Sequence, residues 1–256
     1  MFQQGSNAML GLGLCAWRDG SAREAVALAA ELGYRAVQLD ATHPQTRPRS
    51  LDRSARRDLA ALLRRHQLRC TGFDLWLPPA HLAEGPNVER ATEAIVDAIG
   101  LARELTALVE TRAIVSVVLP VEPNPEAITV IEAAARRHEV AVADYAWPAR
   151  ETGDLGLDPS LAIMANQSAP KAATQFGDRL VTARLRDAGV SGHVPVGSAG
   201  GTLDVPAYAA ALSISAPNVT VVADVRSLRD ATGAAASALR AWTDATEPFG
   251  MQEHES

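Results

Sequence analysis

Charged residues that could do chemistry occur at the ends of apolar runs along the chain. Asp144, Asp158 and Asp224 each lie inside or directly behind such a run, and Arg184 lies in another, LVTARLRD at 180–187. Three convergent carboxylates suit either a divalent cation or a buried partner charge. Arg184 could be that partner, because a guanidinium stays protonated and its planar fork binds carboxylates. The alternative is that Arg184 points outward between helices.

Further polar and aromatic residues follow the same runs and are candidates to bind a substrate. A single charge at the end of a strand can simply mark the solvent boundary, but the set as a whole favours a site. Trp76 and Trp147 offer flat apolar faces for a sugar ring, although each could equally pack a loop onto a helix. The candidates are Trp17, Gln38, Asp40, Asp74, Trp76, His81, Glu122, Trp147, Arg186 and Arg226.

The elements that must position these residues alternate along the chain. Short apolar runs typical of strands are separated, for the most part, by segments with helical spacing. The runs are continuous rather than alternating, which indicates parallel strands covered by helices. Eight such units predict an α/β fold, a (β/α)8 TIM barrel, with the active site at the carboxyl ends of the strands. The predicted strands are 12–17, 36–40, 68–76, 113–120, 140–146, 155–158, 180–187 and 219–225.

Helix start and stop signals support this alternation. Ser21 and Glu24 have the spacing of a capping box, and the helix they begin stops at Gly33. Other helices are predicted to begin at Asn87 and at Pro125, where the missing N–H of proline costs nothing. A doubly wound open sheet is the rival fold, but no GxGxxG motif follows any predicted strand.

Composition limits the possible functions. The chain has 256 residues and no evident linker, which predicts one domain over 9–246 and a polar tail over 247–256. A net charge of −6 disfavours a nucleic-acid partner. Apolar runs stay below the ~18 residues that a membrane span needs. Cys15 and Cys70 fall in different predicted strands, which suggests reduced, buried thiols and a cytoplasmic protein.

Three segments, taken in order, resemble the xylose-isomerase-like barrels, a family that includes sugar isomerases, epimerases, inosose dehydratases and endonuclease IV. The first is AREAVALAAELGYRAVQLD at 22–40, similar to the family's helix and second strand. The second is GLDPS at 156–160, similar to the sixth strand. The third is LVTARLRDAG at 180–189, followed by VPVGSAGGTLDVPAYAAAL at 194–212. The resemblance covers about residues 9–246 and implies the same fold.

The resemblance also implies a metal site built from Glu, Asp, His and Glu on strands five to eight. By position, Asp144 and Asp224 replace the two glutamates, Asp158 keeps the aspartate, and Arg184 stands where the histidine belongs. Gln38 replaces a glutamate of the second strand. Because arginine cannot coordinate a metal, we expect no cofactor and predict that Arg184 takes the place of the cation between Asp144 and Asp224. The alternative is weakly bound Mg or Mn at Asp144, Asp158 and Asp224.

Two functions are compatible with these residues. In the first, a divergent isomerase, epimerase or dehydratase acts on or binds a small sugar or polyol at the carboxyl-terminal mouth of the barrel. Asp144 and Asp224 would be its acid and base, and Arg184 would polarise the substrate carbonyl. In the second, a catalytically inactive barrel binds a carbohydrate or another protein. The expected partner is a small sugar or polyol, with no nucleic acid and no membrane, and a homodimer is compatible with the sequence.

Overall fold

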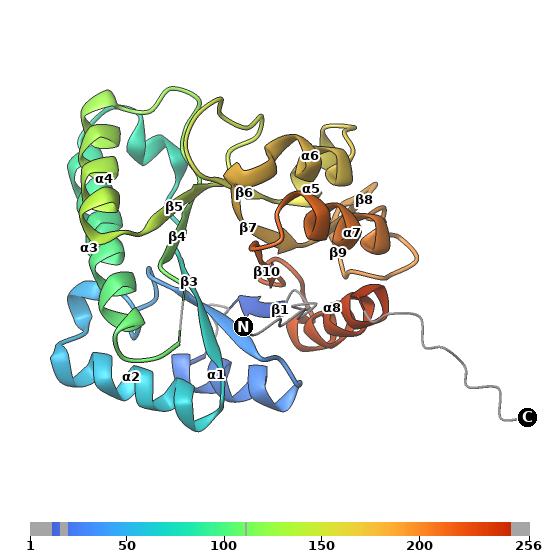
Figure 1. The fold of residues 1–256 in the computed structure, drawn as a ribbon, viewed down its shortest axis with the longest axis horizontal. Helices are drawn as coiled ribbons and strands as arrows, with labels where there is room; N and C mark the ends of the chain where they lie inside the picture. Colours follow the sequence, from blue (N-terminus) through green and yellow to red (C-terminus); the bar gives the residue numbers. More distant parts are fainter. Residues whose placement is uncertain (1–11, 16–19, 111, 247–256) are drawn as a thin grey trace, which may run out of the picture.

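The computed structural model describes residues 12–15, 20–110 and 112–246. Eight parallel strands close into a barrel in the order β1-β10-β7-β6-β5-β4-β3-β2, with helices around it (Figure 1). The predicted (β/α)8 TIM barrel is therefore confirmed, although several strands stop short of the predicted runs. The strands are β1 (Leu12–Cys15), β2 (Ala36–Asp40), β3 (Arg69–Asp74), β4 (Ile114–Val117), β5 (Ala141–Asp144), β6 (Leu155–Leu157), β7 (Leu180–Leu185) and β10 (Thr220–Ala223).

Most helices begin where the sequence signals place them. Ser21 and Glu24 form the predicted capping box. Asn124 caps the helix that Pro125 begins. Asn87 precedes its helix as predicted, but its side chain makes no capping hydrogen bond. The helices are α1 (Ala22–Glu31), α2 (Arg53–Arg65), α3 (Val88–Thr106), α4 (Pro125–His138), α5 (Pro159–Met164), α6 (Ala169–Phe176), α7 (Val205–Ser215) and α8 (Ala231–Thr246), with short 3-10 turns η1 (Pro48–Ser50), η2 (Pro79–Leu82) and η3 (Gly177–Arg179).

The two faces of the barrel wall carry different residues. On β5, Val142 packs into the large core between strands and helices, whereas Ala143 and Tyr145 belong to a separate small cluster with Ile114. Successive side chains of a strand point to opposite faces, so this second cluster lies inside the barrel. The Tyr145 ring packs against Gly156 of β6, where any Cβ would overlap the ring. The glycine therefore makes room for a tyrosine in the lumen.

Two connections at the carboxyl end of the barrel do not follow the simple strand–helix alternation. Residues 145–154, all of which the structure describes, join β5 to β6 without a helix. After β7 the chain forms a hairpin, β8 (Asp187–Gly189) and β9 (Gly192–Val194), which the sequence had not suggested. Asp187 was predicted to end the seventh strand and instead begins this hairpin, where its Oδ1 accepts hydrogen bonds from three backbone N–H groups. The hairpin lies at the carboxyl end of β7, beside the predicted site.

Cys15 and Cys70 are both buried, as expected. None of the helices in the described part of the chain has the length and apolarity required to cross a membrane.

Candidate functional site

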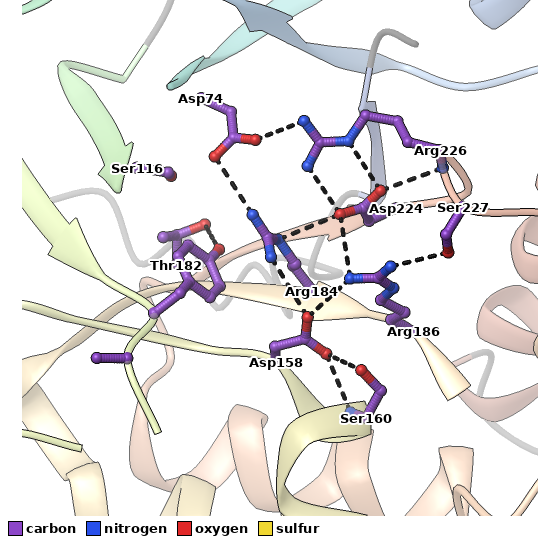
Figure 2. Close-up of polar contacts among 12 residues, drawn as sticks. Asp74, Ser116, Asp158, Ser160, Thr182, Arg184, Arg186, Asp224, Arg226 and Ser227 are labelled. Carbon is purple, nitrogen blue, oxygen red and sulfur yellow. Dashed lines mark hydrogen bonds and ion pairs between the residues drawn. The ribbon is translucent and has the colours of Figure 1, made fainter. Parts of the chain in front are cut away.

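Arg184 lies at the centre of a buried cluster of charges in the barrel lumen. Its Nε is 3.4 Å from Asp224 Oδ2, its Nη1 is 3.3 Å from Asp158 Oδ2, and its Nη2 is 3.3 Å from Asp74 Oδ1. Figure 2 shows the guanidinium between these three carboxylates. They come from the ends of β3, β6 and β10, so the fold itself brings distant parts of the chain together. The alternative that Arg184 points outward between helices is therefore wrong.

Two more arginines complete this cluster. Arg226 binds Asp224 through both edges of its fork, with Nε 3.0 Å from Oδ1 and Nη2 2.8 Å from Oδ2. Its Nη1 lies 2.6 Å from Asp74 Oδ2. Arg186 Nη1 is 3.3 Å from Asp158 Oδ2 and 3.9 Å from Asp224 Oδ2. We call this set the mouth network: Asp74, Asp158, Asp224, Arg184, Arg186 and Arg226.

The mouth network is neutral and almost fully buried. It holds three positive and three negative side chains, and each carboxylate contacts at least two guanidinium groups. Arg186 is the most exposed member, with 10% of its side chain accessible. Removing one partner from such a buried set leaves an uncompensated charge, which is strongly destabilising. The arrangement is therefore fixed by its own electrostatics.

Neighbouring residues hold the network in place. Asp158 also caps α5, because its Oδ1 accepts from Ser160 N at 3.0 Å and Ser160 Oγ at 2.6 Å. The Arg184 guanidinium lies over the Tyr145 ring, 4.2 Å from its centroid, and the Arg226 guanidinium lies over the Trp76 ring at 4.4 Å. Such cation–π contacts stabilise a guanidinium in a dry site. The face of Trp76 that contacts Arg226 is therefore covered and not available to stack on a sugar ring.

Electrostatics in the network keep Asp224 and Arg184 ionised. Burial alone would raise the pKa of Asp224, but the charges of Arg226, Arg184 and Arg186 outweigh burial and hold this pKa far below its usual range. Burial lowers the pKa of Arg184, and the charges of Asp74, Asp224 and Asp158 outweigh that effect and raise it. A carboxylate with so low a proton affinity is a poor general base. Asp224 can therefore present a fixed charge and accept hydrogen bonds, but it is poorly suited to exchange protons.

Asp144 does not join the network, contrary to the sequence-based prediction. Its Oδ1 accepts from the backbone N–H of Leu119 at 3.0 Å and of Ala146 at 2.9 Å, and its Oδ2 lies 3.0 Å from Arg150 Nε. Burial raises the pKa of Asp144, and the two backbone hydrogen bonds and Arg150 only partly oppose it. Asp144 faces the outer side of the wall. The next residue, Tyr145, takes the inward position.

Two other candidates on β2 are buried at the carboxyl end of the barrel. Gln38 donates from Nε2 to Ser116 Oγ across 3.3 Å. Asp40 Oδ1 accepts from Thr42 N at 2.7 Å and from Thr42 Oγ1 at 2.5 Å, which fixes the start of the following loop. Both residues have local partners of their own.

The remaining candidates are scattered. Glu122 is exposed in the loop after β4. Trp147 packs against the main core and lies 6.2 Å from the Phe176 ring, which matches the alternative that it packs a loop. His81 lies in η2 and lines a cavity beside α3 rather than the mouth network. Trp17 lies outside the described residues.

Sequence reasoning missed one residue close to the network. Tyr145 follows the fifth strand directly, but a continuous apolar run gives no sign of which residue faces the lumen. His193 lies on β9 of the hairpin, and burial together with the charge of Arg186 lowers its pKa.

In the part of the chain that the structure describes, no three His, Cys, Asp or Glu side chains are grouped so as to hold a metal ion. This observation differs from the four-ligand site that the family resemblance implies, because the aspartates at the mouth are separated by guanidinium groups.

Neither a family model nor a curated protein matches the sequence. Solved structures do match the fold. A xylose isomerase domain protein from Planctomyces limnophilus superposes with a TM-score of 0.71 at 15% identity, over 93% of this chain and 97% of that one. D-psicose 3-epimerase from Clostridium cellulolyticum H10, solved with D-tagatose, gives 0.70 at 12% identity over 93% and 100%. An L-ribulose 3-epimerase gives 0.69 at 15% identity over 91% and 95%.

The chain thus has the fold of the xylose isomerase-like TIM-barrel epimerases. At these identities the similarity establishes the fold alone, and the chemistry must be argued from the site.

Proposed function

We propose that this chain binds a small sugar or polyol at the carboxyl-terminal mouth of its barrel, without a metal ion and without catalytic turnover. Arg184 takes the place of the metal ion that the family resemblance implies. The observation that carries the proposal is the mouth network itself, in which three arginines and three aspartates neutralise one another inside the lumen. The proposal follows the catalytically inactive alternative and assigns it a carbohydrate ligand.

The donor set argues against a divalent cation. The oxygens of Asp74, Asp158 and Asp224 already accept from guanidinium groups, and arginine cannot act as a ligand. A divalent ion ~4 Å from Arg184 would be repelled by about 8 kcal/mol at an effective dielectric constant near 20. A metal would therefore have to displace the guanidinium that binds all three carboxylates.

The same contacts argue against acid–base catalysis by the proposed pair. Asp144 lies on the outer side of the wall, beside Arg150. Asp224 has its pKa held far below the range of an effective base. Asp158 is occupied by Ser160 and two arginines. Carboxylates in these states are suited to accept hydrogen bonds from hydroxyl groups, and guanidinium N–H groups are suited to donate to them.

Arg186 offers the most accessible edge of the network to a ligand. A polyol carries both donors and acceptors, so it can match a surface of mixed fixed charges without adding a net charge. The similar D-psicose 3-epimerase was solved with D-tagatose, a ketose, which supports a carbohydrate as the class to test first.

The test is a ligand screen of ketoses, aldoses and inositols by saturation-transfer NMR. We expect at least one ligand, with binding lost in Arg186→Gln and retained in Arg136→Gln, a matched change at an exposed residue of α4. Turnover is tested separately, by incubating the ligand with the protein in deuterated water and following exchange at its carbon-bound hydrogens. We expect no exchange and well below one metal ion per chain by elemental analysis.

Exchange that depends on Asp224, or a stoichiometric metal, would instead support the divergent isomerase or epimerase. Failure of every sugar and polyol to bind would favour a protein partner.

A further inference from the structure

A cavity of about 290 Å³ lies beside α3, outside the mouth network. We call it the rim cavity. Its walls are the loop after β2, the loop after β3 and one face of α3, and its apolar lining includes the buried residues Pro48, Leu75 and Ala91. Small-molecule sites are typically concave, with an apolar lining and a few polar groups at fixed positions. The rim cavity has this build at the small end of the usual size range.

Basic side chains outnumber acidic ones in the lining of the rim cavity. Arg47, Arg49, Arg90 and His81 all line it. In the described part of the chain, neither Arg49 nor Arg90 forms an ion pair. The first turn of α3, which includes Arg90, also lacks a side-chain cap, so the positive end of that helix adds to the local potential. An excess of positive charge here contrasts with the net charge of −6 of the whole chain.

The loop that carries the arginines is held in a defined conformation. Arg47 Nε donates to Ser50 Oγ at 2.6 Å, which leaves the two terminal nitrogens of its fork for another partner. Thr46 Oγ1 donates to the carbonyl of Asp40 at 2.5 Å, and Arg56 Nε donates to the carbonyl of Leu51 at 3.0 Å. A pre-ordered loop loses less entropy when it binds a ligand. The cations are thus on a fixed support rather than on a free loop.

Two carboxylates line the same cavity. Glu93 and Asp97 lie four residues apart on α3, on the helix face that also carries Arg90. Arginine forks bind phosphate oxygens in pairs, and carboxylates accept hydrogen bonds from hydroxyl groups. A ligand with an anionic end and a hydroxyl-bearing end could therefore bind the arginines and the carboxylates of the lining at the same time.

We propose that the rim cavity binds a small phosphate monoester that carries hydroxyl groups. Arg47, Arg49 and Arg90 hold the phosphate, and Glu93 and Asp97 accept from the hydroxyls. A phosphate dianion carries more charge and more acceptor oxygens than a carboxylate, so several guanidinium groups bind it more strongly. The net negative charge of the chain disfavours binding of a polymeric anion. This site is independent of the ligand proposed for the mouth, since it uses other residues.

The test is calorimetric titration of the full chain with glycerol phosphate, inorganic phosphate and glycerol. We expect glycerol phosphate to bind, inorganic phosphate to bind more weakly, and glycerol not to bind. The double variant Arg49→Gln/Arg90→Gln should weaken glycerol phosphate binding by at least about tenfold, because two charged hydrogen-bonding groups are lost. The control Arg53→Gln/Arg57→Gln removes the same charge from exposed positions of α2 outside the cavity, and should change binding by less than about twofold.

A second pair of changes tests the other end of the ligand. Glu93→Gln/Asp97→Asn should strengthen binding of inorganic phosphate, because two repelling charges are removed, and should reduce the preference for glycerol phosphate over phosphate. All four arginines tested are exposed, so circular dichroism is expected to show an unchanged fold. Absence of binding by both phosphate compounds, or equal weakening by the two arginine pairs, overturns the proposal. Arg186 does not line the rim cavity, so the outcome of the sugar-binding test with Arg186→Gln does not affect this test.

Discussion

Asp224 and Asp144 make a comparison within one barrel. Both are buried aspartates at the carboxyl end of a strand, and both pair with an arginine of the following loop, Arg226 or Arg150. Their pKa values nevertheless shift in opposite directions. The pKa of Asp224 is held far below its usual range, whereas burial raises that of Asp144.

The difference lies in the number and burial of the cations. Asp224 faces the lumen and contacts three guanidinium groups, whose charges outweigh the cost of burial. Asp144 faces outward and has one, Arg150, which is 30% exposed and therefore partly screened by water. Burial raises the cost of an isolated charge, but a mutually compensating set keeps every member ionised. Facing the lumen or the helices thus decides what a strand-end aspartate can do.

The largest expected effect comes from removing the central cation. Arg184→Met leaves three buried aspartates with one guanidinium fewer, and should lower the free energy of unfolding by about 3–5 kcal/mol. The matched change Arg150→Met removes the one guanidinium that pairs with Asp144, which is partly exposed, and should cost only about 1 kcal/mol. Urea unfolding at neutral pH measures both. Equal losses would show that the lumen and the outer face do not differ in the way described.

Replacing each of the two aspartates by asparagine should give a smaller difference in the free energy of unfolding. Asp224→Asn leaves buried arginines without their counter-charge and should destabilise the protein by about 3 kcal/mol. Asp144→Asn keeps an oxygen that can accept from Leu119 and Ala146, so the change should stay within about 1 kcal/mol. Thermal and urea unfolding of the two variants provide the measurement. A larger loss at Asp144 would reverse the ranking and contradict the comparison.

Lowering the pH should change the contributions of Asp224 and Asp144 to stability in opposite directions. The pKa of Asp224 is depressed in the folded protein, so its stabilisation is complete above the unfolded value near ~3.9 and is lost as pH falls below it. The stability gap between wild type and Asp224→Asn should therefore narrow only below about pH 4. The pKa of Asp144 is raised, so wild type should gain stability relative to Asp144→Asn as pH falls through that raised value. Neither slope can exceed about 1.4 kcal/mol per pH unit, and gaps that change in the same direction would be inconsistent with these shifts.

The smallest effect concerns the aromatic support of the network. Trp76→Leu removes the ring that covers Arg226 and should cost about 1 kcal/mol through the lost cation–π contact. Trp76→Phe keeps a ring and should lose less. Chemical denaturation of the two variants distinguishes them, and equal losses would mean that only the apolar volume of Trp76 matters.

Much of the fold could be predicted because its signals are local. The capping box of Ser21 and Glu24, the proline at 125 and the continuous apolar runs each report on neighbouring residues only. They were sufficient to give the order of strands and helices and hence the barrel. The unexpected hairpin after β7 falls in a glycine-rich segment too short to show a strand pattern.

The site could be predicted only in part, because its contacts cross the barrel. Arg184 was expected to bind strand-end aspartates, and its contacts with Asp158 and Asp224 agree with this. Asp74 was expected only to bind a substrate, since nothing in a sequence shows which residues face each other across a lumen. Asp144 was placed in the site wrongly because strands buried on both faces lack the alternation that would reveal their orientation.

The cross-barrel contact between Arg184 and Asp74 spans 110 positions in sequence. Between them lies the junction of β5 and β6, where the register comprises the single pair Asp144 and Leu155 among the described residues. The bond can form only after both segments of the wall have met, and we expect this to happen late in folding. Substitutions in the network should then leave the rate of folding nearly unchanged and accelerate unfolding. The charges in the lumen thus determine how long the native barrel persists rather than how quickly it forms.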